Sequence, residues 1–176
     1  GEQADACITE GTAALFDGYR RMQGSSAEIA NILNLPVVLL VNARMAGYSV
    51  APLLYGYKHF YSGVHIAGVI FNQVSSPAHY AYLREACSDT GLDCLGYLPV
   101  MEGIKPSSKH NAISLSNRRM IDEQTDLIAA QLEKSIDINR MLNRCNRNFP
   151  CQYTLPYYSD IEDDMHTFPL RKIKIA

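Results

Sequence analysis

The chain has 176 residues, of which 47% are hydrophobic, and it carries 16 basic and 18 acidic residues. This composition suits one globular domain with a buried core and does not build the strong positive field that nucleic-acid binding needs. No apolar run approaches the ~20 residues that cross a bilayer, and the five cysteines include no CxxC pair. We therefore expect a reduced cytoplasmic protein that binds neither nucleic acid nor a membrane.

Four apolar segments predict the strands of one sheet: residues 5–9, 36–41, 65–71 and 94–98. The second and third are rich in Val or Ile, as buried strands commonly are. Segments with a helical period separate the four strands. This alternation predicts an α/β fold with a mostly parallel sheet flanked by helices.

The first helix is predicted from a capping box, in which Ser25 is the N-cap and Glu28 follows three residues later. Ile29, Ile32 and Leu33 then fall on one side of the helix. This spacing predicts an apolar face that packs against the sheet.

The second helix is predicted after Ser49, a candidate N-cap, because Pro52 then falls in the first turn, where a missing N–H costs little. A third helix is predicted to begin at Ser76-Pro77 and to end before Gly91. The second helix has apolar residues at helical spacing: Leu53, Leu54, Tyr57, Phe60 and Tyr61.

Residues 121–142 predict two further helices, divided near residues 135–137. The polar residues 143–169 include three prolines and predict a linker. A strand is predicted almost at the start of the chain, and residues 170–176 alternate basic and apolar residues like the beginning of another strand. We therefore expect the chain to be the middle piece of a longer protein.

The cysteines divide into two groups. Cys7, Cys87 and Cys94 lie in or beside apolar segments and are predicted to be small core residues. Cys145 and Cys151 lie in a polar stretch, where a disulfide between them is the alternative to a fully reduced chain.

In a parallel sheet, ligands bind beyond the carboxyl ends of the strands, so the residues after each strand are the first site candidates. Glu10 follows the first predicted strand, and Asp17 lies seven residues later in a loop that contains glycine. Such carboxylates can hold Mg²⁺, which takes one or two carboxylates together with waters and substrate phosphates. The alternative is a solvent-facing turn in which Asp17 bonds the nearby backbone.

Further candidates lie beyond the first loop, each with a simpler alternative. Ser25 and Ser26 begin a helix, where free N–H groups favour an anion, although a plain capping box also explains them. Asn72 ends the third predicted strand and can offer a donor and an acceptor to a purine edge, or can tie the next turn. His110, next to Lys109 in a polar loop, can contact an anionic substrate or be an incidental surface residue.

One phosphate-binding motif is absent from the sequence. The 176 residues contain no GxxxxGK[ST] phosphate loop. The stretch from Gly18 to Gly24 lies next to a helix but lacks the lysine of that motif. By itself, this sequence therefore has no evident cradle for a triphosphate.

Four segments in a fixed order are nevertheless distinctive: ITEGTAALFDG (8–18), GSSAEIANILNLPVVLLVNAR (24–44), GVHIAGVIFNQV (63–74) and LGYLP (95–99). Through them, from about residue 5 to residue 143, the chain resembles the cobyrinic acid a,c-diamide synthase family, glutamine-dependent amidotransferases of corrin (cobalamin) biosynthesis. The collinearity of the segments is specific, although no single one is.

The resemblance implies a P-loop NTPase fold similar to that of dethiobiotin synthetase, with the N-terminal strands and the phosphate loop lying before Gly1. Residues 1–142 would be the C-terminal part of the ATP-dependent synthetase domain. Residues 143–169 would be a linker, and residues 170–176 would begin the glutaminase domain. The exposed sheet edge of such a fragment favours association, so we expect a homo-oligomer.

The resemblance also implies the reaction of the whole enzyme. With ATP and Mg²⁺ as cofactors, it would phosphorylate the a and c carboxylates of cobyrinic acid or a related tetrapyrrole. Ammonia, released from glutamine by the missing glutaminase domain, would then displace phosphate from the acyl phosphate. This chain alone would be inactive, because it lacks the phosphate loop.

Matching positions carry the family's site onto this sequence. The resemblance implies that Glu10 is a carboxylate of the Mg²⁺ or phosphate site and that Asp17 helps to position the substrate carboxylate. It places Asn72 against adenine, with the backbone near Pro99 completing the base pocket. We assign the substrate side to two residues, Ser26 and His110.

This sequence departs from the family pattern at four positions near the expected site. A family glycine is Ala14 here, a strand-end aspartate is Asn42, and two family arginines are Gln73 and Lys109. These changes favour an alternative function, namely a non-catalytic binding or regulatory module with a dethiobiotin-synthetase-like fold.

Overall fold

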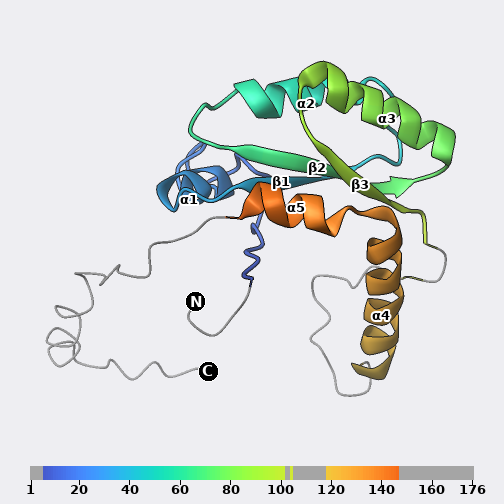
Figure 1. Cartoon of the computed structure of the whole chain (residues 1–176). Coiled ribbons are helices and arrows are strands. Elements are labelled where there is room, and N and C mark those ends of the chain that lie inside the picture. Colours follow the sequence, from blue (N-terminus) through green and yellow to red (C-terminus); the bar gives the residue numbers. More distant parts are fainter. Residues whose placement is uncertain (1–5, 102–103, 105–117, 147–176) are drawn as a thin grey trace, which may run out of the picture. The chain divides into compact units, whose positions relative to one another are not determined.

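Three parallel strands form the sheet, in the order β1, β2, β3 (Figure 1). The computed structural model describes residues 6–101, 104 and 118–146. The strands within these residues are β1 (Val37–Asn42), β2 (Ile66–Val74) and β3 (Cys94–Pro99). Each coincides with a predicted strand, and the predicted α/β fold with a parallel sheet is confirmed.

The fourth predicted strand, over residues 5–9, is wrong for the residues that the structure describes. Residues 6–9 form no strand, and Ile8 is 89% exposed. An apolar segment forms a strand only where a neighbouring strand supplies hydrogen-bond partners, and residues 6–9 pair with neither β1 nor β3. Cys7 is consequently exposed, so its prediction as a core residue is also wrong.

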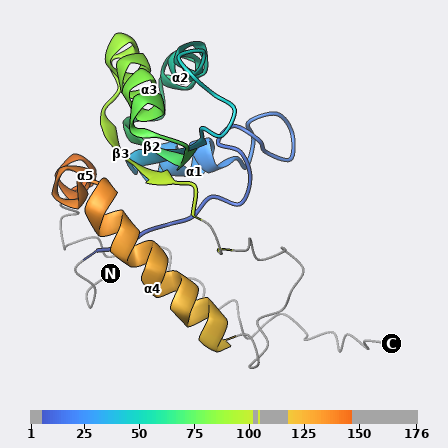
Figure 2. The ribbon, with the colours of Figure 1, turned by 90° about the vertical axis from the view of Figure 1, so that its right-hand side faces the viewer.

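Helices lie on both faces of the sheet (Figures 1 and 2). The helices are α1 (Ser26–Ile32), α2 (Val50–His59), α3 (Pro77–Thr90), α4 (Arg118–Ser135) and α5 (Ile138–Cys145). Helices α2 and α3 pack beside one another on one face, and α5 lies on the other. Among the described residues, none of the helices has the length and apolar character that a bilayer crossing requires.

Alternation along the strands divides the core into two clusters. Val69 and Phe71 of β2 are fully buried toward α2 and α3, where they join Leu54 and Leu83. Ile70, between them in sequence, faces the opposite side of the sheet. There it packs with Leu95 of β3 and with Ile136, which lies between α4 and α5. The period of two residues that a strand imposes therefore directs neighbouring side chains of β2 into separate cores.

The capping box of α1 is confirmed, but the predicted apolar face is wrong. The Ser25 hydroxyl accepts a hydrogen bond from the Glu28 amide at 3.2 Å. The Glu28 carboxylate accepts from the Gly24 amide at 2.6 Å. The helix buries Ala27 and Ala30 instead of its larger side chains; those at Ile29, Ile32 and Leu33 are all exposed.

Helix α2 begins where the sequence predicts, although Ser49 does not cap it. Ser49 makes no side-chain capping bond, because its backbone (φ −59°, ψ −5°) is already helical, whereas an N-cap is extended. The buried side chains of α2 are Val50, Ala51 and Leu54. Two residues of the predicted apolar face, Leu53 and Phe60, are exposed, because the face that meets the sheet lies toward the start of the helix.

Helix α3 has both predicted ends. The Ser76 hydroxyl accepts a hydrogen bond from the His79 amide at 3.1 Å, and Pro77 occupies the first turn. Gly91 closes the helix in the left-handed conformation, with φ +62°, which costs glycine little.

The predicted division near residues 135–137 is confirmed. Asp137 caps α5 by accepting a hydrogen bond from the Arg140 amide at 2.9 Å. The junction docks on β3, where the Asp137 amide donates to the Leu95 carbonyl. Gly96 permits this approach, because a Cβ there would lie 2.3 Å from the Ser135 carbonyl oxygen.

The predicted domain boundary at residue 142 falls inside α5, which continues to Cys145. The described part of residues 1–146 belongs to one compact unit. The predicted linker beyond Asn146 and the predicted start of a glutaminase domain at 170–176 lie outside the described residues.

Candidate functional site

The register of the parallel strands brings two predicted site residues to one edge of the sheet, together with one position that departs from the family pattern. Asn42, the last residue of β1, is the register partner of Asn72 in β2. Two residues beyond Asn72, Val74 is the partner of Pro99, which ends β3. Asn72 and Pro99 therefore lie at the carboxyl edge, where open parallel sheets bind ligands, with Asn42 directly beside Asn72.

One of the two polar atoms of the Asn72 side chain is hydrogen-bonded within the protein. Its Oδ1 atom accepts a hydrogen bond from the amide of Gln73 at 2.8 Å. Gln73 has φ +62°, a left-handed conformation that is uncommon for a residue other than glycine. No other hydrogen bond of the described residues engages the Asn72 side chain, so its Nδ2 group is available as a donor toward a ligand.

The Asn42 side chain is hydrogen-bonded to the backbone of the loop that follows β1. Its Oδ1 atom accepts from the Arg44 amide at 3.0 Å, which is the pattern of an Asx turn. The Ala43 amide donates to the Asn72 carbonyl at 2.8 Å and extends the pairing of β1 and β2 past the strand end. The two loops after β1 and β2 therefore begin side by side.

The loop that contains Glu10 and Asp17 is fixed against the start of α1. The Ala27 amide donates to the Leu15 carbonyl at 2.9 Å. Gly11 lies so close to Ser26 that a Cβ on Gly11 would be 2.5 Å from the Ser26 Oγ atom. The next turn is anchored on α2 through Phe16, whose ring stacks on that of Tyr57. This places Gly11, and hence its neighbour Glu10, beside Ser26.

The carboxylates of Glu10 and Asp17 have no partner among the residues that the structure describes. Both residues are exposed, and no described hydrogen bond or ion pair joins either carboxylate to another side chain. Within the described ranges there is no group of three or more His, Cys, Asp or Glu residues that could hold a metal ion. Mg²⁺, which takes one or two carboxylates together with waters and phosphate oxygens, would not need such a group.

His79, which the sequence did not single out, joins the two loops at the carboxyl edge. The Ser75 amide donates to the His79 Nδ1 atom at 3.2 Å, so Nδ1 carries no proton. The proton is therefore on Nε2, which donates to the Ala46 carbonyl at 2.5 Å. The sequence feature that could have identified His79 is its position, three residues after the N-cap Ser76 and within the first turn of α3.

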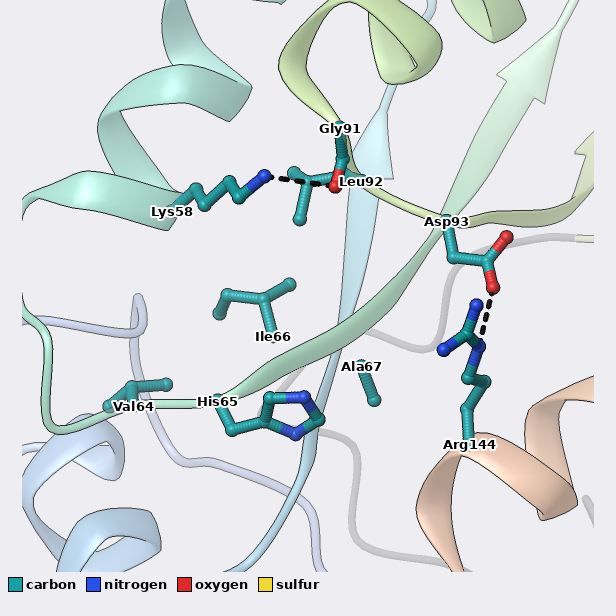
Figure 3. A pocket seen from close by; sticks show the side chains of 9 residues that line it. All are labelled: Lys58, Val64, His65, Ile66, Ala67, Gly91, Leu92, Asp93 and Arg144. Carbon is teal, nitrogen blue, oxygen red and sulfur yellow. Dashed lines mark hydrogen bonds and ion pairs between the residues drawn. The ribbon is translucent and has the colours of Figure 1, made fainter.

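A cavity of about 490 Å³ lies at the opposite, amino edge of the sheet (Figure 3). Its lining includes Lys58 of α2, His65 before β2, and the pair formed by Asp93 and Arg144. Lys58 donates to the carbonyl of Gly91, at the end of α3, at 2.9 Å. None of the predicted site residues borders this cavity, and its charged groups are engaged in holding helix ends in place.

The remaining predicted residue, His110, lies outside the described residues. The structure thus brings Asn72 and Pro99 to one edge and Gly11, next to Glu10, against Ser26.

Comparison with known proteins extends this description. Residues 2–108 match the family model described as an AAA domain. The cobyrinate a,c-diamide synthases of Caldanaerobacter subterraneus subsp. tengcongensis and Gloeobacter violaceus are 32% and 40% identical over 99% and 81% of this chain. The hydrogenobyrinate a,c-diamide synthase of Brucella ovis is 34% identical over 78% of it. No solved structure matches the chain.

The chain spans about a third of the length of these relatives, namely 37%, 32% and 32%. The AAA domain match implies a nucleotide-binding, P-loop NTPase-like fold and agrees with the parallel sheet flanked by helices. The four collinear segments of the sequence lie within residues 2–108, which that model matches. The chain therefore belongs to the family described as an AAA domain, and over most of its own length it is similar to cobyrinate a,c-diamide synthases.

Proposed function

We propose that this chain is part of the synthetase portion of a glutamine-dependent amidotransferase that amidates the a and c carboxylates of cobyrinic acid or a related tetrapyrrole. The observation that carries the proposal is the shared carboxyl edge, where the strand register places Asn72 near the end of β3. The similarity to cobyrinate and hydrogenobyrinate a,c-diamide synthases supports this class of substrate. We place the enzyme in the cytoplasm as a homo-oligomer.

The nucleotide base is proposed to bind at the ends of β2 and β3. Because the Oδ1 atom of Asn72 accepts from the Gln73 amide, the Nδ2 group is left to donate to a ring nitrogen of adenine. The backbone near Pro99 would line the other side of the base. The bond from His79 to the Ala46 carbonyl would hold the loop after β1 in place beside this pocket.

The charged end of the site is proposed to lie at the loop beside α1. ATP would phosphorylate a substrate carboxylate, and ammonia from a glutaminase portion outside this chain would displace phosphate to give the amide. Both steps bring anions together, so the site must offset their repulsion. Glu10 would hold Mg²⁺, which supplies positive charge to the phosphates. Asp17 would orient the substrate carboxylate, and Ser26 and His110 would contact the substrate.

The proposal is tested in the full-length protein that contains this chain. We expect ATP and glutamine consumption only when cobyrinic acid or a metallo-sirohydrochlorin is present. Glu10→Gln is expected to lower the rate about 100-fold, the order of effect seen when one charge-stabilising group is removed from an active site. Glu85→Gln, at an exposed position of α3, is the matched control and should leave the rate unchanged. Wild-type turnover in Glu10→Gln would remove Glu10 from the mechanism.

The alternative function is a non-catalytic binding or regulatory module. Its support is the side chain of Asn42, which is committed to the Arg44 amide and replaces an acidic residue of the family pattern. The two functions differ in one measurement. A module would bind ATP in equilibrium dialysis without consuming ATP or glutamine in the presence of any tetrapyrrole carboxylate.

A further inference from the structure

One extra residue interrupts β2 at the carboxyl edge of the sheet. From Phe71 to Val74, β2 advances by three positions, whereas the paired segment of β3 advances by two. The same end of β2 pairs with β1 without a shift up to Asn72. Gln73 therefore has no register partner in the described sheet. It forms a β-bulge, a feature that often lies beside a ligand site and redirects a side chain.

The bulge keeps two residues of β2 in one core. Phe71 and Val74 both belong to the cluster on the side of α2 and α3, and they are 0% and 1% exposed. In a regular strand, residues three positions apart point to opposite faces, so the extra residue is needed to bury both. Gln73 adopts φ +62°, a conformation in which bulges commonly have glycine. The buried residues on either side hold the glutamine in this strained backbone.

The bulge also directs a backbone donor to the Asn72 side chain. Because Gln73 has no register partner, its amide can donate to the Asn72 Oδ1 atom, which it does at 2.8 Å. An unrestrained carboxamide can turn by 180° and exchange its oxygen with its NH₂ group. A donor fixed at Oδ1 leaves one of these two orientations. The groups that remain for a ligand are the Nδ2 donor and the second lone pair of Oδ1.

We propose that Gln73 is a positioning residue, whose left-handed backbone fixes the Asn72 amide in the orientation that selects adenine over a 6-oxopurine. The inference rests on the proposed function, in which Asn72 contacts the base of ATP. Adenine presents a ring-nitrogen acceptor beside its 6-amino donor, and an asparagine can pair with both. A 6-oxopurine instead presents an oxygen acceptor, which would meet the Oδ1 atom. With its amide fixed, Asn72 cannot rotate to suit that base.

Two substitutions of Gln73 test the role of its backbone. Gln73→Gly retains the N–H group and permits the left-handed conformation without strain, so the preference for adenine should persist. Gln73→Val also retains the N–H group, but a β-branched residue rarely adopts this conformation. Valine should therefore move the backbone, release the Oδ1 atom and lower the preference.

Asn34→Val is the matched control. Asn34 also has a positive φ, +52°, and it follows the C-cap of α1. Valine imposes the same backbone conflict there, at a position that the proposed function does not use. It should lower stability without changing the preference between bases.

The measurement is equilibrium dialysis of the full-length protein with ATP and with inosine triphosphate (ITP), whose base is a 6-oxopurine. The unmodified protein and Gln73→Gly should bind ATP about ten-fold more tightly than ITP, the order of discrimination of one bidentate base contact. In Gln73→Val the ratio should fall toward one, whereas Asn34→Val should retain it. Asn72→Asp, which replaces the Nδ2 donor by a second acceptor, should weaken the binding of ATP more than that of ITP.

The proposal is overturned if the unmodified protein binds ATP and ITP equally, if it binds neither, or if Gln73→Val keeps the ratio of the unmodified protein. An equal loss of the ratio in Asn34→Val would also overturn it, because the preference would then follow stability alone. Turnover with a tetrapyrrole carboxylate judges the proposed function separately. A protein that amidates with ATP and ITP alike retains that function and loses this inference, whereas selective ATP binding without turnover does the reverse.

Discussion

The two faces of the sheet are covered to very different extents. On the face of α2 and α3, Leu39, Val69 and Phe71 join one large buried cluster. On the other face, the buried cluster consists of Ile70, Leu95 and Ile136. The covered face is built from helices that directly connect neighbouring strands. The other face depends on residues 132–141, which follow the last strand by more than thirty positions, and at β1 it leaves Leu40 64% exposed.

The largest expected effect is on the free energy of unfolding, when buried side chains are truncated on the two faces of β2. Phe71→Ala should lower the free energy of unfolding by about 3–5 kcal/mol, because Phe71 is fully buried in the larger cluster. Ile70→Ala, on the thinner face, should cost about 2 kcal/mol, the low end for such a truncation. Urea denaturation followed by circular dichroism measures both. Equal losses would show that the two faces are packed equally well.

A second substitution tests how the α4–α5 junction is held. Gly96→Ala should destabilise the protein by about 2 kcal/mol, because φ is +142° and the new Cβ would meet the Ser135 carbonyl. Gly56→Ala is the matched control, since it lies inside α2 with nothing within 4 Å of its Cβ position. Gly56→Ala should stabilise by about 0.5–1 kcal/mol. A shift of the same sign in both melting temperatures would contradict this assignment.

The loops after β1 and β2 lead into the helices of the well-covered face, and His79 is hydrogen-bonded to both loops. His79→Ala should cost about 1–2 kcal/mol, because the Ser75 amide and the Ala46 carbonyl lose a shared partner. Amide hydrogen exchange should rise at Ser75 and in residues 43–47 and remain unchanged in β3. His79→Gln retains a donor and an acceptor and should restore part of the protection. Uniform exchange across the molecule would mean that His79 acts only on global stability.

The smallest expected effects on stability come from replacing two serines that lie at the starts of helices. Ser25→Ala should cost about 1 kcal/mol, because the hydroxyl accepts from the Glu28 amide. Ser49→Ala should change stability by less than about 0.5 kcal/mol, because its side chain makes no capping bond. Thermal unfolding of the two variants under one set of conditions gives the comparison. A larger loss at Ser49 would require a contact that its helical backbone does not provide.

Three features of the site illustrate what could be predicted and what could not. The position of Asn72 at the carboxyl edge was predictable, because the apolar run before it marks a buried strand that ends there. The contact of Gly11 with Ser26 was not, because it depends on how the loop before α1 folds back on the helix. His79 was also missed, since its partner Ala46 lies 33 residues away.

The sequence by itself determined the three strands, the ends of α3 and the division before α5, because apolar runs, caps and glycine turns act over a few residues. Tertiary structure decided which faces are buried. Ile32 of α1 is 72% exposed and Ile8 lies in no strand, although both have the apolar character of core residues. Burial requires a second surface to pack against, and no local pattern specifies where the rest of the chain will supply one.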